Sequence, residues 1–420
     1  EVFSHGLYVL LSLPVFFLVA LPVKKIIIPY FYKQKFATAY EFLGIKFDQK
    51  VRILAAVLFI VWRTFWGATI LYIPTKILSL ITGWNSSLII LIVGFSVLAY
   101  TTYGGIRAVM ITDTLQFFVL FIGLIIGIWT ISGQFSGGFS EIISIGLENG
   151  LGKPFFPFDP GIFSFDPTIR ITFWSCTTGT FVAFLARYSA DQMVVQRYFT
   201  AKSQKDATRG FWLNVVSAVV SLSILAVLGY VIFAHSYVAG TIGKFPKPIN
   251  YFVNFVRALP DGVTGLVIAV LLSATMSSID SGANSCTRVW ISDIVELLSK
   301  KTLSLKVTRY FSVLFGLLII FISLFVGKLG SIFEIANKVV NGFGSPLLAL
   351  FIMGKFSKYF TIKGVLAGGI SGAIFSAFIS LFVKNLALHY YAVVNLTGTM
   401  ALGFVFSYAD KMLIKLKTGP

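Results

Sequence analysis

The sequence predicts an all-α polytopic membrane protein with about eleven transmembrane helices, each of which needs about 20 apolar residues. Hydrophobic residues make up 57% of the 420 residues and charged residues only 12%, which is about half the charged fraction of a soluble domain. The mean hydropathy is +0.88. A water-soluble fold of this size has too little interior to hide so much apolar surface. The composition therefore excludes a soluble enzyme, a secreted disulfide scaffold and a disordered chain.

The apolar residues fall into long stretches that lack the alternation of β-barrel strands. In chain order, the predicted spans cover residues 5–29, 51–82, 87–104, 106–132, 168–199, 206–238, 262–298, 306–327, 331–354, 360–383 and 388–410. Gly104 and Gly105 predict a tight turn that separates the third span from the fourth. We expect residues 1–420 to form a single transmembrane domain.

The loops between the spans alternate in charge. Basic loops or turns follow the odd-numbered spans, and the other loops carry few basic residues, except for the segment 239–260. Lys and Arg gather on the cytoplasmic side of membrane proteins, so topology explains the net charge of +18 without a nucleic-acid partner. The pattern predicts a multi-pass protein of the plasma or inner cell membrane, with residue 1 on the outer side and the C-terminus in the cytoplasm.

The start of the chain carries a further expectation. Glu1 stands in the place of a Met, and the first apolar run is too long and begins too early for a cleaved signal peptide. An outer N-terminus without a signal peptide needs an odd number of preceding spans. We therefore expect that the N-terminus of this chain is truncated.

Ionisable residues inside a span are costly in a bilayer, so each one is a functional candidate. The spans hold Arg63, Asp113, Arg187, Asp191, Asp280, Glu334 and Lys338. Arg63 needs an oxygen partner, which could be an acidic side chain of the protein or a carboxylate of the substrate. Arg187 and Asp191 are four residues apart and could pair with each other on one helix. Glu334 and Lys338 repeat this spacing.

The strongest constellation lies in the seventh span. Ser277 and Ser281 are one turn apart, with Ser278 and Asp280 beside them, so helical spacing places these oxygens on one broad face. Hydroxyl and carboxylate oxygens are hard ligands of the kind that a dehydrated Na⁺ needs. The alternative is a face of small residues that lets two transmembrane helices approach closely. The carboxylate of Asp280 favours the cation site.

A second constellation surrounds Asp113, about two turns into the fourth span. Thr112 and Gln116 lie nearby in the sequence. A carboxylate at this depth is a candidate functional group. The alternative role for Asp113 is a capping or interhelical hydrogen bond.

Four segments of the chain resemble the sodium:solute symporter family, whose members transport sugars, proline, sialic acid, pantothenate and iodide. They are YTTYGGIRAVMITDTLQ, DQMVVQRYFTAKS, MSSIDSGANS and GSPLLALFIMG. The resemblance extends from about residue 5 to about residue 410. It implies a LeuT-like fold, with ten core helices in two inverted repeats and broken helices that hold ion and solute near the middle of the bilayer. The chain matches this pattern from the second core helix onward, so we expect the first core helix to be absent.

The resemblance also implies sodium ligands. The matching positions are Ala274 through its carbonyl, and Ser277, Ser278, Ser281, Asp113 and Asp280 through their side chains. Ala274, Ser277 and Ser278 match the site that the family shares. Asp113 matches the family aspartate of the fifth core helix. In relatives with two sodium ions, that aspartate joins side chains of the eighth core helix, here Asp280 and Ser281.

The same resemblance bears on the solute. Leu13 stands where sugar-transporting relatives carry an acidic residue, which argues against a sugar of that type. Arg63 lies on the helix whose arginine receives the substrate carboxylate in sialic-acid-transporting relatives. The expected solute is therefore an organic anion, such as a sialic or other organic acid. Arg187 and Asp191 are further candidate substrate residues.

The expected function is Na⁺-coupled secondary active import of a small organic solute through the lipid bilayer by alternating access, with Na⁺ as the coupling ion. The sequence contains no Ser-His-Asp group, P-loop or metalloprotease motif, so it predicts no enzyme. Two alternatives stay open. One is a proton-coupled transporter in which Asp113 or Asp280 titrates, and the other is a membrane sensor module derived from a symporter.

Overall fold

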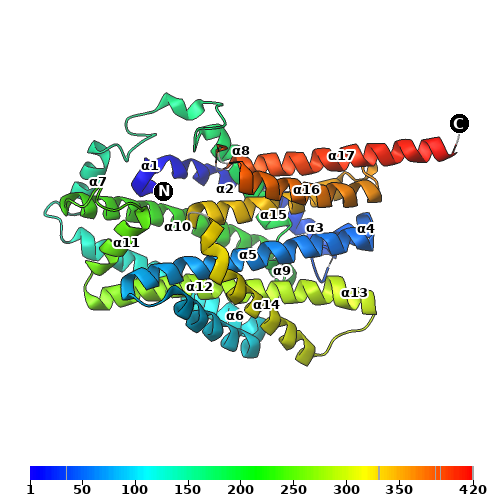
Figure 1. Cartoon of the computed structure of the whole chain (residues 1–420), viewed down its shortest axis with the longest axis horizontal. Coiled ribbons are helices and arrows are strands. Elements are labelled where there is room, and N and C mark those ends of the chain that lie inside the picture. Colours follow the sequence, from blue (N-terminus) through cyan, green and yellow to red (C-terminus); the bar gives the residue numbers. More distant parts are fainter. Residues whose placement is uncertain (35, 330–331, 384, 388, 419–420) are drawn as a thin grey trace.

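A computed structural model describes residues 1–34, 36–329, 332–383, 385–387 and 389–418, apart from the side chains of residues 103–110, 329, 332–341 and 418. The regular structure in these ranges is helical, and many of the long helices run side by side along the longest axis of the molecule (Figure 1). The α-helices are α1 (Val2–His5), α2 (Leu13–Pro22), α3 (Ile28–Gln34), α4 (Glu41–Lys46), α5 (Gln49–Thr82), α6 (Ser86–Ser132), α7 (Gly138–Glu148), α8 (Phe173–Ser189), α9 (Gln192–Thr200), α10 (Gln204–Val238), α11 (Pro248–Arg257), α12 (Asp261–Trp290), α13 (Glu296–Ser299), α14 (Leu305–Val326), α15 (Ile332–Lys355), α16 (Ile362–Phe382) and α17 (Tyr390–Thr418). Short 3-10 or π segments are η1 (Gly6–Ser12), η2 (Val23–Ile27), η3 (Pro160–Phe163), η4 (Ile291–Val295), η5 (Gly327–Leu329) and η6 (Ser357–Tyr359).

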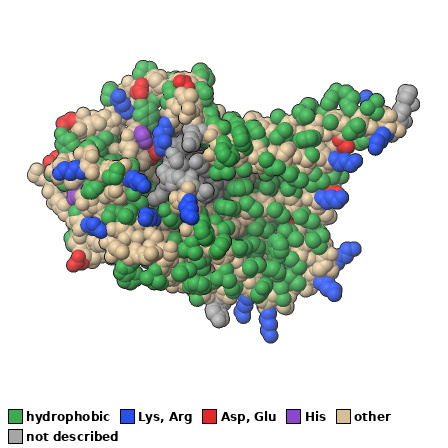
Figure 2. Space-filling model, viewed as in Figure 1, with side chains coloured by type: hydrophobic (Ala, Val, Ile, Leu, Met, Phe, Trp, Pro, Cys, Tyr) green, Lys and Arg blue, Asp and Glu red, His purple; other side chains and the backbone are tan. Residues whose placement is uncertain are grey.

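The described part of the chain contains eight helical segments that are long and apolar enough to cross a membrane. They are Val2–Gln34, Gln49–Thr82, Ile111–Ser132, Gln204–Val238, Asp261–Ser299, Leu305–Val326, Ile362–Phe382 and Tyr390–Lys417. Two shorter apolar helices are Ser86–Thr102 and Gly342–Lys355. Figure 2 shows hydrophobic side chains spread over the middle of the molecule, with Lys and Arg toward both ends of the view. The predicted class, an all-α polytopic membrane protein, is confirmed.

The tight turn predicted at Gly104 and Gly105 is not formed. Helix α6 continues through both glycines from Ser86 to Ser132, where separate third and fourth spans were expected. A glycine inside a helix costs only about 1 kcal/mol, and packing along a neighbouring helix offsets that cost. Helix α6 packs closely along α12, where Gly123 leaves no room for a Cβ atom beside Val270.

The predicted span 168–199 is broken instead of continuous. Helix α8 ends at Ser189 and α9 begins at Gln192. Between them, Asp191 adopts an extended conformation, and its carboxylate accepts the backbone N–H of Met193 at 3.0 Å. An aspartate in this position starts a new helix because it satisfies an otherwise unpaired N–H group.

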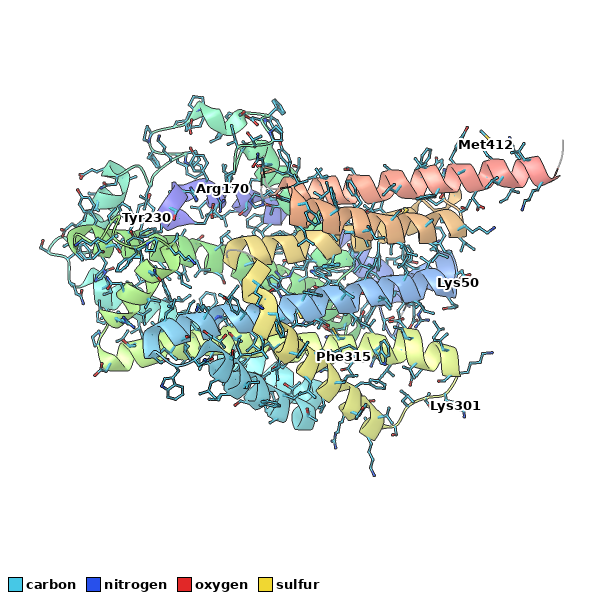
Figure 3. All side chains as sticks on the ribbon, viewed as in Figure 1. Lys50, Arg170, Tyr230, Lys301, Phe315 and Met412 are labelled. Atoms are coloured by element: carbon cyan, nitrogen blue, oxygen red, sulfur yellow. The ribbon has the colours of Figure 1, made fainter. Side chains whose placement is uncertain are left out.

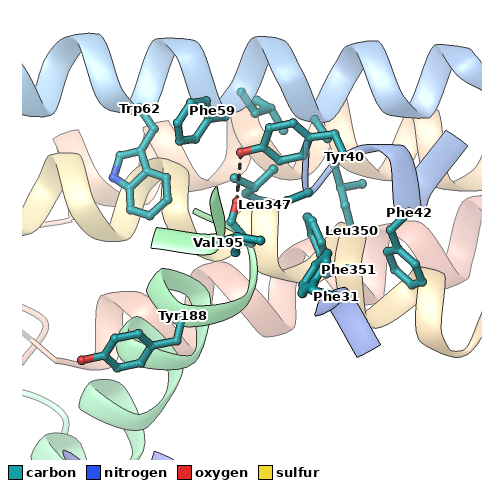
Figure 4. Packing of buried hydrophobic residues seen from close by; sticks show 14 of the residues in the cluster. Phe31, Tyr40, Phe42, Phe59, Trp62, Tyr188, Val195, Leu347, Leu350 and Phe351 are labelled. Atoms are coloured by element: carbon teal, nitrogen blue, oxygen red, sulfur yellow. Dashed lines mark hydrogen bonds between the residues drawn. The ribbon is translucent and has the colours of Figure 1, made fainter. Parts of the chain in front are cut away.

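The largest hydrophobic core cluster packs around this break. The ring of Tyr40 is fully buried in it, and its hydroxyl donates a hydrogen bond to the carbonyl of Ala190 at 2.9 Å (Figure 4). Phe42 stacks on Phe351 of α15, with ring centroids 5.7 Å apart. The segment before α4 and the helix α15 therefore hold the end of α8 in place.

Three segments predicted as loops contain short helices, namely α4, α7 and α11. Each helix buries an apolar side chain, as Phe42, Ile142 and Phe255 show. The sequence interpretation missed them because they are shorter than a membrane span. The side chains of Glu334 and Lys338 lie outside the described residues.

Candidate functional site

Helix α12 positions the serines of the predicted ion site. Ser277 and Ser281 are one turn apart and both reach α6, the helix that carries Asp113. Two threonines of α12 bond within the helix instead, since Thr275 and Thr287 each donate at 2.8 Å to a carbonyl four residues earlier. The serine hydroxyls thus form part of the polar connection between the two helices.

The carboxylate of Asp113 is the centre of this cluster. Its Oδ1 atom accepts a hydrogen bond from the Ser277 hydroxyl at 2.5 Å, and its Oδ2 atom accepts one from Ser281 at 3.3 Å. Oδ2 also accepts the Nη2 group of Arg197, a residue of α9, at 3.2 Å. The alternative interpretation of Asp113, an interhelical hydrogen bond, is what the geometry displays. The same oxygens form a hard, anionic donor set that suits Na⁺.

Asp280 lies on α12 near Ser281 but faces a different partner. Its Oδ2 atom accepts the hydroxyl of Tyr100 at 2.8 Å, and its Oδ1 atom accepts the backbone N–H of Ser281 at 2.5 Å. The side chain of Asp280 is buried. Ser281 therefore contacts both carboxylates, Asp280 through its backbone N–H and Asp113 through its hydroxyl, and none of the hydrogen bonds of the described residues joins the two carboxylates directly.

The remaining predicted ion ligands, Ala274 and Ser278, are at least partly exposed on the surface of α12. Ala274 is exposed and Ser278 is half-buried. Among the described residues, no hydrogen bond or ion pair draws the Ser278 hydroxyl toward another helix. These two positions differ in this respect from Ser277, whose hydroxyl is held by Asp113.

Arg63 and Asp191 form a buried ion pair that joins α5 to the break between α8 and α9. The Nε group of Arg63 donates to Oδ1 of Asp191 at 3.0 Å, and the Nη2 group contacts Oδ2. Their side chains are 5% and 0% exposed, so water contributes little to their solvation. Arg63 also lies over the ring of Trp62, at 4.7 Å from the centroid. Of the two partners expected for Arg63, an acidic side chain of the protein is therefore the one that the structure contains.

Arg187 does not pair with Asp191, although their spacing allowed such a pair. Asp191 lies beyond the end of α8 and turns to Arg63. The side chain of Arg187 is exposed, and it takes part in none of the ion pairs of the described residues.

A polar cluster that the sequence did not predict ties the segment before α4 to the end of α12. Asp293, which is 0% exposed, accepts Arg52 Nε and the Thr38 hydroxyl, each at 2.6 Å. Arg52 also lies 3.5 Å from Glu41. Asp293 lies near the end of a predicted span, where a charged side chain often reaches the interface. Its π-helical position in η4 turns the carboxylate inward instead.

Comparisons with known proteins agree with this architecture. The family model described as the sodium:solute symporter family matches residues 1–372. Sodium-coupled monocarboxylate transporter 2 of Mus musculus is 26% identical over 390 residues, covering 91% of this chain and 62% of the relative. The sodium-dependent multivitamin transporter of Oryctolagus cuniculus is 29% identical over 365 residues, covering 85% of this chain and 56% of the relative. The chain thus spans about three fifths of the length of such relatives.

A solved structure shares the fold. It is described as the substrate-bound outward-open state of a Na⁺-coupled sialic acid symporter, and it matches with a TM-score of 0.84 at 24% identity. The match covers 97% of this chain and 85% of that chain. The arrangement of helices is therefore LeuT-like, as the resemblance implied. The family consists of transporters and not of enzymes, and its model covers most of the described helices. The chain belongs to the sodium:solute symporter family.

Proposed function

We propose that the protein couples the movement of Na⁺ down its gradient to the import of a small organic solute by alternating access. The observation that carries this proposal is the oxygen cluster between α6 and α12, in which one carboxylate, Asp113, meets the hydroxyls of Ser277 and Ser281. Such a cluster inside a transmembrane bundle offers Na⁺ a replacement for its hydration shell. Each Na⁺ that moves inward also releases about 2.3 kcal/mol of free energy per 100 mV of membrane potential.

The proposed ligands divide into two groups. The first sodium ion uses the carbonyl of Ala274 and the hydroxyls of Ser277 and Ser278, which lie along one face of α12. The second uses Asp113 and Ser281, with Asp280 close by. The exposure of Ala274 and the half-burial of Ser278 support the first group, because an ion and its further ligands need access to that face.

The proposed solute is a small carboxylate. Arg187 supports this assignment because its guanidinium is exposed and takes part in no ion pair of the described residues. Arg63 is less available, since Asp191 already neutralises it in a buried pair. We assign Arg63 and Asp191 the role of fixing the break beside Arg187. Two proteins to which the chain is similar, a sodium-coupled monocarboxylate transporter and a Na⁺-coupled sialic acid symporter, are consistent with a carboxylate.

The proposed orientation places the loops 30–50 and 300–309 in the cytoplasm and the segment 133–167 outside. Lys50 and Lys301 lie at one end of the molecule, and Arg170 and Tyr230 lie toward the other (Figure 3). The two basic loops thus share one end, as positive charges on the cytoplasmic side require.

Sodium-dependent uptake into proteoliposomes tests the ion assignment. Ser277→Ala should raise the half-saturating Na⁺ concentration about tenfold, because an oxygen contact to a charged group contributes about 1.5 kcal/mol. Ser285→Ala is the matched control, because the Ser285 hydroxyl is buried and donates to the carbonyl of Gly282 in its own helix, at 2.9 Å. Unchanged sodium dependence in Ser277→Ala would count against the site. Uptake driven by a pH gradient alone would favour the proton-coupled alternative.

Competition tests the solute assignment separately. Uptake is measured against a panel of monocarboxylates, a sialic acid and neutral sugars, in the wild type and in Arg187→Gln. Carboxylates should inhibit uptake by the wild type. The variant should need about tenfold higher carboxylate concentrations for the same inhibition, because it lacks one charge-assisted hydrogen bond. Competition by neutral sugars alone would exclude an organic anion as the solute.

A further inference from the structure

A groove of about 950 Å³ lies on the outside of the bundle, between the end of α2 with η2 and the start of α10. Its walls include Lys24, Lys205, Arg209, Trp212, Leu213 and Val216. The groove is separate from the ion cluster, whose residues belong to α6, α9 and α12. It lies at the same end of the molecule as the segment before α4, since the hydroxyl of Tyr32 in α3 donates to the carbonyl of Lys202 at 3.0 Å.

The segment α2–η2 and the first turns of α10 run antiparallel along the groove. On α10, Lys205, Arg209, Trp212 and Val216 recur at intervals of three or four residues, so they share one face of the helix. Phe17 of α2 lies beside Trp212, with ring centroids 6.3 Å apart. Lys24, which follows Phe17 by two turns of helix, therefore lies toward the start of α10, beside Lys205 and Arg209.

The groove is cationic at one end and apolar at the other. None of the ion pairs in the described part of the chain includes Lys24, Lys205 or Arg209. The nearby carboxylate of Asp206 is engaged by the Ser203 hydroxyl at 2.6 Å. At the apolar end, Leu213 is 69% exposed. Arg209 and Val216 are about 10 Å apart along the helix, which is the scale of a lipid headgroup followed by the first part of an acyl chain.

We propose that this groove binds one anionic phospholipid of the cytoplasmic leaflet. The phosphate lies between Lys24, Lys205 and Arg209, close to the N-terminus of α10, where the helix dipole also favours an anion. An acyl chain follows the apolar wall formed by Trp212, Leu213 and Val216. The assignment goes beyond the proposed transport function, and only its leaflet rests on the proposed orientation. A single lipid molecule matches both ends of the groove, with its phosphate at the basic end and its acyl chain along the apolar wall, which is why a lipid fits better than free phosphate.

Lipid titration of the detergent-purified protein, followed by native mass spectrometry, tests the proposal with phosphatidylglycerol and phosphatidylcholine as probes. The wild type should retain one phosphatidylglycerol in preference to phosphatidylcholine. The triple variant Lys24→Gln/Lys205→Gln/Arg209→Gln should bind it about a hundredfold more weakly, because each basic residue near an anionic lipid contributes about fivefold. Lys301→Gln/Lys306→Gln/Arg309→Gln removes the same charge from exposed positions before and in α14, and it should bind like the wild type. Equal losses in both triple variants would mean a diffuse charge effect and would overturn the proposal.

Fluorescence in nanodiscs gives an independent readout that survives poor folding of a triple variant. Phosphatidylglycerol with a brominated acyl chain should quench the tryptophan emission of the wild type, and Trp212→Phe should remove that part of the quenching. Brominated phosphatidylcholine should quench Trp212 less. Inorganic phosphate alone should not displace the lipid at millimolar concentration. Quenching that is unaffected by Trp212→Phe, or displacement by inorganic phosphate, would refute a lipid in this groove.

Discussion

At the residue scale, the Asp113 carboxylate serves several donors at once. Two hydroxyls of α12 and the guanidinium of Arg197 approach its two oxygens. Arg197 is 58% exposed, so this ion pair is accessible to solvent and worth little by itself. Its position nevertheless supplies positive charge where the proposed sodium ion would supply it, so the two cations compete for one carboxylate.

Removing the competing cation should make sodium binding easier. We expect Arg197→Gln to lower the half-saturating Na⁺ concentration of uptake by about two- to fivefold, the equivalent of an exposed ion pair. Uptake at a range of Na⁺ concentrations measures this change. Arg309→Gln, an exposed arginine on α14, should leave the sodium dependence unaltered. A raised Na⁺ requirement in Arg197→Gln would show that Arg197 assists the ion instead of competing with it.

The Arg63–Asp191 pair makes a prediction about stability. Asp191→Ala leaves a buried guanidinium without its counter-charge, and breaking one side of such a pair costs about 3–5 kcal/mol. A large fall in the thermal unfolding temperature of the detergent-solubilised protein is therefore expected. Arg63→Ala/Asp191→Ala should recover part of the loss, because no uncompensated charge remains. Arg187→Ala, at an exposed position, should change the unfolding temperature little, and an equal fall there would contradict the assignment.

At this scale the sequence predicts residue types better than partners. Asp113 and the serines of α12 were expected near one another, and the hydrogen bonds join Ser277 and Ser281 to Asp113. The contacts of Tyr100 and Arg197 with the two carboxylates were missed, because they depend on how α6, α9 and α12 lie in space. One signal was present, since Tyr100 and Arg197 both lie in segments that resemble the family.

At the element scale, α16 and α17 show how small residues let two helices meet. Gly364, Gly368 and Gly372 recur every four residues along α16, and each faces α17. A Cβ atom at Gly368 would lie only 2.3 Å from the Cα atom of Gly403. This approach is backbone against backbone, so no side chain can turn aside to make room.

Adding one methyl group at that contact should separate the helices. Gly368→Ala is expected to destabilise the protein by about 1–3 kcal/mol, the usual cost of overpacking. Gly265→Ala is the matched control, because no atom lies within 4 Å of its added Cβ and alanine is the better helix former. Thermal unfolding measures both changes. An unfolding temperature that stays the same in Gly368→Ala would mean that the two helices are less closely packed.

Hydropathy predicts where helices exist but not where they break. The apolar run 168–199 was expected as one span, yet Asp191 starts a second helix within it. Conversely, Gly104 and Gly105 were expected to end a helix that continues. In both cases the local signal is ambiguous, since an aspartate can cap or pair and a glycine can turn or pack. The neighbours that decide between these roles come from distant parts of the chain.

At the scale of the whole molecule, the charge alternation predicts which ends of the helices face the cytoplasm. Single cysteines test this with a membrane-impermeant maleimide on intact cells. Glu148→Cys, at the exposed end of α7, should be labelled from outside. Lys301→Cys, at the opposite end (Figure 3), should be labelled only after permeabilisation. The native Cys176 and Cys286 are buried, so they should remain unlabelled. Labelling of both introduced cysteines, or of Lys301→Cys alone, in intact cells would contradict the orientation.

The global class of the protein followed from composition alone, because only a bilayer accommodates this amount of apolar surface. The LeuT-like arrangement came from the resemblance of short segments. Composition fixes the number of spans only approximately, since α6 is long enough to include two predicted ones. The identity of the solute depends on a few side chains such as Arg187, whose surroundings no sequence pattern describes.

The shared carboxylate of Asp191 also has an evolutionary consequence. One side chain both starts α9 and neutralises Arg63, so a substitution there disturbs two requirements at once. Positions 63 and 191 should therefore covary among homologues. Where position 63 has lost its charge, position 191 needs only a helix cap, and serine or asparagine becomes acceptable there. Where the arginine persists, only a carboxylate at position 191 satisfies both requirements.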